Sequence, residues 1–284
     1  MVNNIMPKID ILLATYNGER YLKEQIDSIF RQSFSSWRVI AHDDGSCDGT
    51  LELLNKYATQ YPDKFIVLNE GKKFGNPYDN FSYILSTSTS DYFAFCDQDD
   101  VWLENKLELF YDEMKKVEEK DKPVLIYSDL LVVDEKLNTI FDSMINAQKL
   151  PHSIISSHPD FIRVQNIITG CATLANKKCK EFYFPTNPDM RMHDWWLGLI
   201  VANKGICSKV EQPTIKYRQH SNNSVGFVES SFLKFLKKVS LKKIREDFYA
   251  FNKMSKAFDG KEFSLFYYLY LKARVVHLRF LKGE

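Results

Sequence analysis

The stretch Tyr92-Phe93-Ala94-Phe95-Cys96-Asp97-Gln98-Asp99-Asp100 decides the fold. Its first five residues are apolar and predict a buried strand, and three carboxylates follow that strand within four positions. Packed carboxylates repel one another and raise one another's pKa unless they bind a cation. The cation is usually a hard divalent ion that prefers oxygen ligands. The stretch therefore predicts a strand whose C-terminal end carries a metal ion.

Two other interpretations of the acidic segment have to be weighed. Aspartate is common in a solvated turn between a strand and a helix, so an ordinary turn stays open. A calcium loop of the helix-loop-helix type would use Asp97 first, Asp99 third and Glu108 twelfth. That loop fails, because Val101 sits where a ligand is needed and Trp102 where the sharp turn needs glycine.

Apolar runs alternate with segments of helical periodicity along the chain. Strands are expected at residues 9–14, 37–41, 65–68, 92–96, 124–127, 167–174 and 214–217, and helices at residues 21–30, 48–57, 80–85, 103–119 and 193–202. This alternation predicts an α/β fold with a mostly parallel sheet flanked by helices, whose ligand crevice lies outside the C-terminal ends of the strands. Residues 138–160 have weak periodicity, and we expect them to form a long surface loop over that crevice, where a substrate arrives.

The bulk composition is that of an ordinary globular protein, with 284 residues, 44% of them hydrophobic. The five cysteines are scattered without a CxxC pair, so neither a disulfide framework nor a zinc site is indicated. The first eight residues lack the features of a signal peptide, and no apolar run approaches the roughly 18 residues of a membrane span. We therefore expect a cytoplasmic protein.

The chain changes character after residue 227. Residues 228–284 hold 13 Lys and Arg against 6 Asp and Glu, whereas the formal charge of the whole chain is +1. Two amphipathic helices are expected there, the first with an apolar face that includes Phe232, Phe235, Phe248 and Phe251. These helices either pack on the preceding domain, on each other or in a homodimer, or they form a basic surface for an anionic membrane. No nucleic-acid-binding motif accompanies the charge.

Several motifs together resemble those of the family 2 glycosyltransferases, which have a GT-A fold with a Rossmann-like sheet. The resemblance covers residues 8 to 225 and is carried by Thr15-Tyr16-Asn17, Gln32, His42-Asp43-Asp44-Gly45-Ser46-Cys47-Asp48-Gly49-Thr50 and Asp97-Gln98-Asp99-Asp100-Val101-Trp102. It implies a catalytic domain at residues 8–227, dependent on a nucleotide-sugar, and a C-terminal helical extension at residues 228–284.

The resemblance also implies roles for single residues. In that family the first loop and the acids after the second strand hold the nucleoside, which here implies Thr15, Tyr16, Asn17 and Asp44, with Asp43 open as a turn acid. The DxD-type motif touches the ribose and binds Mn or Mg, which we carry over to Asp97, Asp99 and Asp100.

The segment Tyr217-Arg218-Gln219-His220 resembles the variant found in bacterial rhamnosyltransferases. Arg218 would bind phosphate, because its guanidinium is permanently charged and forked. His220 would complete the metal shell or contact the diphosphate, and an exposed structural histidine is the alternative.

Asp194 matches the acid that deprotonates the acceptor hydroxyl in inverting members of the family. The alternative is a helix N-cap, because Asp194 precedes Trp195-Trp196-Leu197. The processive Q-x-x-R-W motif is absent from this sequence, so transfer of one sugar per encounter is implied.

The resemblance as a whole implies an enzyme at the inner face of the plasma membrane. It would pass L-rhamnose from dTDP-L-rhamnose to a lipid-linked saccharide during the synthesis of surface polysaccharide. A UDP-hexose or UDP-N-acetylhexosamine transferase on the same fold is one alternative. A catalytically silent scaffold that binds a sugar nucleotide is another.

Overall fold

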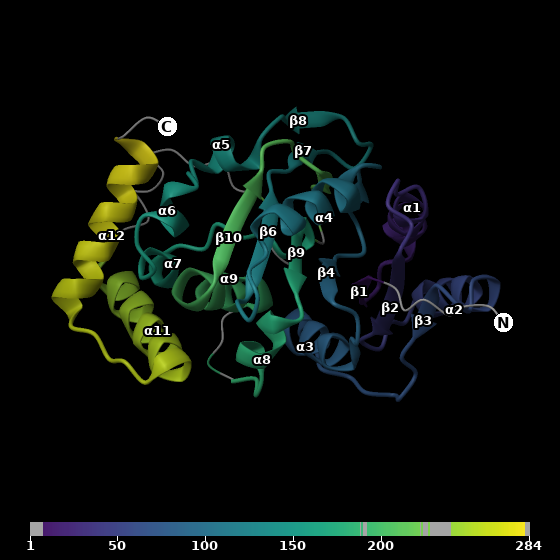
Figure 1. Cartoon of the computed structure of the whole chain (residues 1–284), viewed down its shortest axis with the longest axis horizontal. Helices are drawn as coiled ribbons and strands as arrows, with labels where there is room; N and C mark the ends of the chain where they lie inside the picture. Colours follow the sequence, from purple (N-terminus) through teal and green to yellow (C-terminus); the bar gives the residue numbers. More distant parts are fainter. Residues whose placement is uncertain are drawn as a thin grey trace.

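A seven-stranded sheet runs through the middle of the molecule in the order β10-β6-β9-β4-β1-β2-β3 (Figure 1). The structure is a computed structural model, and it describes residues 8–187, 189, 192–221, 223, 227 and 240–281. The strands are β1 (Ile9–Thr15), β2 (Trp37–Asp43), β3 (Phe65–Val67), β4 (Tyr92–Cys96), β6 (Val124–Ser128), β9 (Thr173–Asn176) and β10 (Ile206–Val210). Only β9 runs antiparallel to its neighbours, β4 and β6, so the expected mostly parallel sheet is confirmed.

Both faces of this sheet are buried, because successive side chains of a strand point to opposite faces. In β1, Ile11 and Leu13 belong to one apolar cluster and Leu12 belongs to the other. The first cluster lies under α1 (Glu19–Phe30), α2 (Thr50–Gln60) and α4 (Lys106–Val117). The second lies under α3 (Pro77–Thr87), α8 (Lys178–Tyr183) and α9 (His193–Lys204). The GT-A fold class expected from the sequence is thus the observed one.

A second, four-stranded sheet brings the residues after Tyr217 to the acidic segment that follows β4. Its order is β5-β11-β7-β8, formed by β5 (Val101–Trp102), β11 (Ile215–Arg218), β7 (Leu131–Val133) and β8 (Thr139–Phe141). The pairing of β5 with β11 places the residues after Tyr217 beside the acidic segment that ends at Asp100. The sequence had placed a helix from residue 103, but that helix begins at Lys106.

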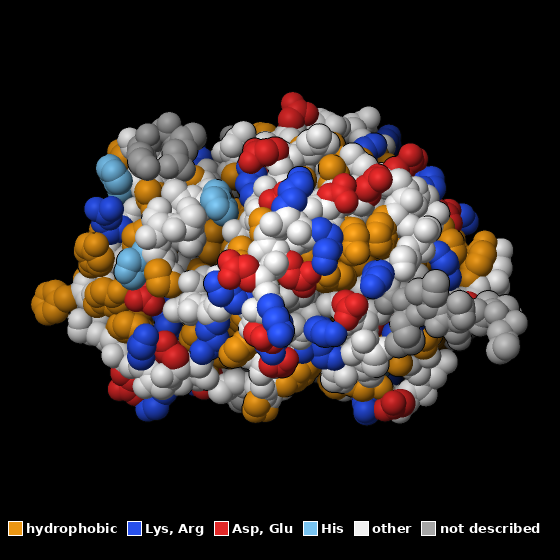
Figure 2. All heavy atoms as spheres, in the orientation of Figure 1, with side chains coloured by type: hydrophobic (Ala, Val, Ile, Leu, Met, Phe, Trp, Pro, Cys, Tyr) orange, Lys and Arg blue, Asp and Glu red, His pale blue; other side chains and the backbone are white. Residues whose placement is uncertain are grey.

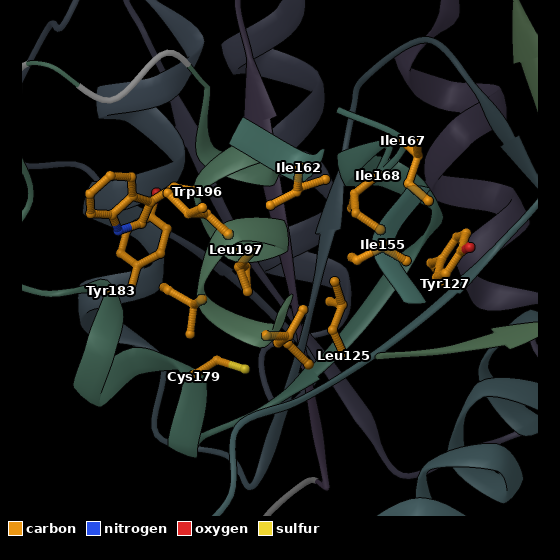
Figure 3. Close-up of a cluster of buried hydrophobic side chains, with 14 of the residues drawn as sticks. Leu125, Tyr127, Ile155, Ile162, Ile167, Ile168, Cys179, Tyr183, Trp196 and Leu197 are labelled. Atoms are coloured by element: carbon orange, nitrogen blue, oxygen red, sulfur yellow. The ribbon is translucent and has the colours of Figure 1, made fainter. Parts of the chain in front are cut away.

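The expectation of a surface loop at residues 138–160 is wrong. This segment begins in β8 and continues into the short helices α5 (Met144–Gln148) and α6 (Ser153–Ser156), and α7 (Phe161–Val164) follows it. Ile154 and Ile155 are buried in the same apolar cluster as Ile162 from α7 and Leu197 from α9, and Figure 3 shows the last three of these residues. One-turn helices are too short to show an amphipathic period, which is why the sequence pattern was weak.

Two further strand assignments needed correction. The strand expected at residues 167–174 begins only at Thr173, and a single 3₁₀ turn, η1 (Gly170–Ala172), precedes it. β10 was not expected, because most of its residues are only half-buried and its apolar pattern is correspondingly weak.

The C-terminal helices α11 (Leu241–Asp259) and α12 (Leu265–Phe280) pack against the body of the protein at the left of Figure 1. Phe251 of α11 and Tyr268 of α12 are buried in the same cluster as the residues of α9. The buried Arg163 of α7 binds Asp160 and Asp259 at 2.7 Å each, which ties α11 to the body.

The described part of the C-terminal segment therefore packs on protein, which is one of the alternatives left open by the sequence. The other part of its expected apolar face, with Phe232 and Phe235, lies outside the described residues. A domain boundary between residues 227 and 228 stays a prediction. Among the described residues, no helix combines the length and the apolar character that crossing a membrane requires.

Candidate functional site

Polar side chains gather where the parallel strands β1 and β2 end side by side. Thr15 and Asp43 are register partners, and the Thr15 hydroxyl donates to Asp43 Oδ1 at 3.0 Å. The other carboxylate oxygen of Asp43 accepts the backbone N–H groups of Gly45 at 3.1 Å and Ser46 at 2.8 Å. Asp43 is thus a turn acid, as the alternative interpretation held, and Thr15 supports that turn.

Asp44 fixes the neighbouring loop after β3. It is buried, and its two carboxylate oxygens accept the backbone N–H groups of Phe74 at 2.5 Å and Gly75 at 2.8 Å. A carboxylate has about four acceptor positions, so these two bonds leave room for a further donor. The predicted contact of Asp44 with a nucleobase stays a prediction.

The first loop is braced by a glutamine from the acidic segment. The side chain of Gln98 accepts from the backbone N–H of Tyr16 at 2.8 Å and donates to the backbone carbonyl of Tyr16 at 3.0 Å. Gly18 follows in this loop, and a Cβ there would lie 2.2 Å from Gln98 Oε1, so any larger residue would displace the Gln98 side chain from Tyr16. The Tyr16 ring itself is exposed, as a side chain that meets a ligand must be.

Asn17 closes the same loop onto the turn after β2. Its backbone N–H donates to Ser46 Oγ at 2.8 Å, and its Oδ1 accepts from the backbone of Cys47 at 2.9 Å. The sequence-predicted nucleoside residues Thr15, Tyr16, Asn17 and Asp44 are therefore brought together at one edge of the sheet. Their roles in binding stay predictions.

The acidic segment after β4 divides into two groups. Asp97 and Asp100 lie with Cys171 so that one ligand atom from each falls within 4.8 Å of the others. Burial, followed by the charge of Asp99, raises the pKa of Asp97 to about 7 and holds the pKa of Asp100 well above its usual value. This electrostatic strain is what a bound cation relieves.

Asp99 turns instead toward His220. The two side chains meet at 2.8 Å, between Asp99 Oδ2 and His220 Nε2, and both are largely buried. Two ligands of one ion, each about 2.1 Å from it at right angles, lie about 3 Å apart, so this pair fits a divalent cation. Asp100 is fully buried and accepts the backbone N–H of Arg218 at 3.1 Å, which places it behind this pair.

Arg218 is held by protein acceptors. Its guanidinium donates to the carbonyls of Asp99 at 2.8 Å and Glu135 at 2.6 Å, and to the Glu24 carboxylate at 2.5 Å. It also lies over the Tyr21 ring, 4.6 Å from its centroid. These contacts join α1, the acidic segment and the loop after β7. Binding of phosphate by Arg218 stays a prediction. The three hydrogen bonds described here are made to protein acceptors and not to a phosphate.

Asp194 lies in the first turn of α9 and faces the acidic segment. Its Oδ2 accepts the backbone N–H of Gly170 at 3.1 Å, and its Oδ1 accepts the Asn166 side chain at 3.3 Å. Burial raises its pKa to about 6, and its charge in turn contributes to the raised pKa of Asp97. The alternative assignment as the helix N-cap is wrong, because α9 begins at His193 after the cap residue Met192.

The two tryptophans after Asp194 have structural contacts. Trp196 is buried in the apolar cluster of Figure 3. Trp195 is half-buried, and its indole N–H donates to the carbonyl of Ile162 at 2.5 Å.

Sequence reasoning missed Lys106, which is fully buried beneath the site. Its ammonium donates to the carbonyl of Cys171 at 2.8 Å and lies 4.4 Å from the ring centroids of both Trp102 and Phe110. Burial lowers its pKa to about 7. The next peptide back, Gly170, is the one that holds Asp194, so Lys106 anchors the turn that orients this acid. A lysine in a helix rich in Lys and Glu gave no signal of burial.

The comparisons with known proteins agree with this geometry. Residues 10–133 match the family model described as Glycosyl transferase family 2, and this span contains both acidic turns. The chain therefore carries a glycosyltransferase family 2 domain at residues 10–133. The match ends before Asp194, Arg218 and His220.

Two curated relatives are similar to this family 2 chain. The dTDP-rhamnosyl transferase RfbG of Shigella flexneri is 28% identical over 224 residues, which are 75% of this chain and 73% of that protein. The putative glycosyltransferase EpsE of Bacillus subtilis is 35% identical over 132 residues, 46% of each chain. The chain spans about half the length, or less, of several Rickettsia glycosyltransferases that it also matches.

Solved structures share the fold. TarS of S. aureus, residues 1–349 in complex with UDP-GlcNAc, superposes with a TM-score of 0.63 at 15% identity, covering 95% of this chain and 72% of that one. The mannosyltransferase PcManGT of Pyrobaculum calidifontis, in complex with GDP-Man and Mn²⁺, gives a TM-score of 0.52 at 14% identity, covering 96% and 81%.

Proposed function

We propose that this family 2 glycosyltransferase is an inverting, metal-dependent and non-processive enzyme that moves one sugar from a nucleoside diphosphate to a saccharide acceptor. The observation that carries the proposal is the position of Asp194. Its carboxylate accepts the backbone N–H of Gly170, the residue before Cys171, and the Cys171 sulfur lies within 4.8 Å of carboxylate oxygens of Asp97 and Asp100. Asp194 therefore lies beside the acidic segment. A base and an acidic ion site side by side are what transfer of a sugar to a hydroxyl requires.

In the proposed reaction Asp194 takes the proton of the acceptor hydroxyl. The oxygen attacks the anomeric carbon, the bond from that carbon to the diphosphate breaks, and the electron pair leaves with the nucleoside diphosphate. The configuration at the anomeric carbon inverts because attack comes from the opposite face. The hydrogen bonds from Gly170 and Asn166 hold the Asp194 carboxylate in a fixed orientation while it accepts the proton.

A divalent ion, Mn or Mg, would be held by Asp99 and His220, and it would neutralise charge on the departing diphosphate. Asp100 belongs to the proposed metal site through the backbone of Arg218, which its carboxylate fixes. Tyr16, Asn17, Asp44 and Asp97 would contact the nucleoside. Burial of the acids makes the absence of a cation costly, which supports the metal assignment.

For the donor we propose dTDP-L-rhamnose, and for the acceptor a lipid-linked saccharide of surface polysaccharide synthesis. The support is the similarity to a relative whose name is dTDP-rhamnosyl transferase, which extends over 75% of this chain. A UDP-sugar is the second candidate, favoured by the TarS structure that holds UDP-GlcNAc on the same fold.

A screen for nucleotide release tests the proposal. The full chain is incubated with dTDP-L-rhamnose or with common UDP-sugars, in Mn, Mg or EDTA, and the free nucleoside diphosphate is measured. We expect release of dTDP that EDTA abolishes. Release of UDP alone would replace the donor, and no release from any donor in either metal would overturn the assigned activity. The anomeric configuration of the product, determined by NMR, tests inversion separately.

A further inference from the structure

The outward face of α12 is apolar and aromatic. Phe266 and Tyr270 are 85% and 53% exposed, and Leu265 and Leu269 beside them are 42% and 39% exposed. The opposite face of the same helix is buried against the body through Tyr268, Leu271, Val275 and Leu278. The helix therefore has two apolar faces, and the described part of the protein covers one of them.

The charge of α12 is of one sign. Between Leu265 and Phe280 the helix has Lys272, Arg274, His277 and Arg279 and no aspartate or glutamate. The neighbouring α11, in contrast, carries acidic residues among its lysines. Figure 2 shows mainly apolar side chains at the left end of the molecule, over α12, with histidine and scattered Lys or Arg side chains between them. The surface is complementary to negative charge and to apolar material at once.

The cations differ in how they are held. Lys272 donates to the carbonyl of Val164 at 3.1 Å, and Arg279 donates to the carbonyls of Lys149 and Gln148 at 3.1 and 2.7 Å. Arg274 and His277 are exposed, on the same side as Phe266 and Tyr270.

We propose that this face of α12 docks on the surface of an anionic membrane. Aromatic rings and leucines at the level of the lipid headgroups bury apolar area, while lysine and arginine are attracted to anionic lipid. The sequence had placed a membrane contact on the face that includes Phe248 and Phe251. The structure packs those two rings against Tyr268, with centroids 5.5 and 5.3 Å away, so α12 presents the apolar face that the described residues leave uncovered.

A second copy of the chain fits this face less well. In a two-fold contact each α12 would meet the same patch of its partner, so Arg274 and His277 of one copy would approach those of the other. The helix offers no carboxylate to pair with them. An anionic lipid surface supplies the missing negative charge and accepts the aromatic rings as well.

Co-sedimentation of the full chain with vesicles tests the inference. Vesicles of phosphatidylcholine, with or without phosphatidylglycerol, are compared at low and high salt. We expect binding to the anionic vesicles only, weakened by salt. Arg274→Gln should reduce the partition coefficient about fivefold, and Phe266→Gln with Tyr270→Gln at least about tenfold. Circular dichroism checks that the variants keep their helices.

Matched controls lie elsewhere on the surface. Ile140→Gln on β8 removes an exposed apolar side chain, and Lys116→Gln on α4 removes an exposed cation; both should bind as the wild type does. Absence of wild-type binding, or equal binding by the Phe266 and Tyr270 variant, would overturn the inference. So would a wild-type dimer in light scattering that this variant converts to a monomer without any binding to vesicles.

Membrane docking itself does not depend on the proposed function. Only its expected effect on turnover rests on the proposed lipid-linked acceptor. Sedimentation needs neither donor nor metal, so its result is independent of whether the donor assignment holds. If the donor is correct, the Phe266 and Tyr270 variant should transfer normally to a short soluble acceptor and more slowly to a lipid-linked one in vesicles. If the ratio of the variant's rate to the wild-type rate were the same on both acceptors, a role for membrane docking in transfer would be contradicted.

Discussion

His220 Nε2 lies 2.8 Å from Asp99 Oδ2, although the two residues are 121 positions apart in the chain. The pairing of β5 with β11 brings them together, because Asp99 lies just before β5 and His220 lies just after β11. Behind them the ring of Tyr21 packs on His220, with centroids 4.8 Å apart. The contact thus depends on three segments that meet only in the folded protein.

Replacing Asp99 tests the metal assignment. We expect Asp99→Asn to lose metal-dependent nucleotide release by at least ~100-fold, because a neutral amide weakens cation binding and leaves the departing diphosphate uncompensated. Titration with Mn and Mg measures whether excess metal restores activity. The exposed Asp63→Asn is the matched control and should be unchanged. Near-wild-type turnover of Asp99→Asn in either metal would show that the cation is held elsewhere.

Much of the fold could be predicted from the sequence, and the reason is periodicity. The strands β1, β2 and β4 are continuous apolar runs because both faces of the sheet are buried, and α1 shows a clear amphipathic pattern. Their C-terminal ends then placed Thr15, Asp44 and Asp97 at one edge before any contact was known. The short elements between β8 and α7 and the strand β10 gave no such pattern.

Less of the site could be predicted, because its contacts are between distant segments. The sequence identified Arg218 as a cation near phosphate, but its partner Glu24 lies on α1, and nothing local indicates that pairing. Gln98 lies between two aspartates, and its sequence context indicates no role for it, yet its side chain hydrogen-bonds the first loop at Tyr16. Lys106 likewise has the sequence context of a solvated helix, and only the fold buries it.

Arg218→Lys should act mainly on stability. A lysine cannot reach the carbonyls of Asp99 and Glu135 and the Glu24 carboxylate together. Some of these acceptors therefore lose the hydrogen bond that the Arg218 guanidinium gives them. We expect the free energy of unfolding to fall by about 3 kcal/mol, measured by urea denaturation. The exposed Arg31→Lys should have no effect. If stability were unchanged and only the KM for the donor rose, Arg218 would bind phosphate rather than join the three segments.

The buried Lys106 should make stability depend on pH in a defined window. Burial lowers its folded pKa to about 7 from the ordinary value of 10.5, so between these values the unfolded chain binds the extra proton. Stability therefore rises with pH across that window, by up to about 1.4 kcal/mol per pH unit, and Lys106 adds no further change below it.

We expect Lys106→Met to lack this contribution, as measured by urea denaturation at pH 7 and pH 9. The exposed Lys56→Met should keep the wild-type dependence. Identical slopes for wild type and Lys106→Met would mean that Lys106 keeps its proton in the folded protein.

Asp194→Asn addresses the proposed base directly. Burial raises the pKa of Asp194 to about 6, so the carboxylate that accepts a proton is formed as the pH rises through that value. Wild-type kcat should therefore increase across pH 6 and level off above it. The asparagine variant should bind donor and metal normally but transfer sugar at least ~100-fold more slowly, the usual scale for loss of a general base.

Its residual rate should lack the step near pH 6. Asp189→Asn, which removes only a surface ion pair with Lys253, is the control. Donor affinity that collapses in Asp194→Asn, with kcat intact at saturation, would make Asp194 a binding residue and leave the base to be found among the other acids.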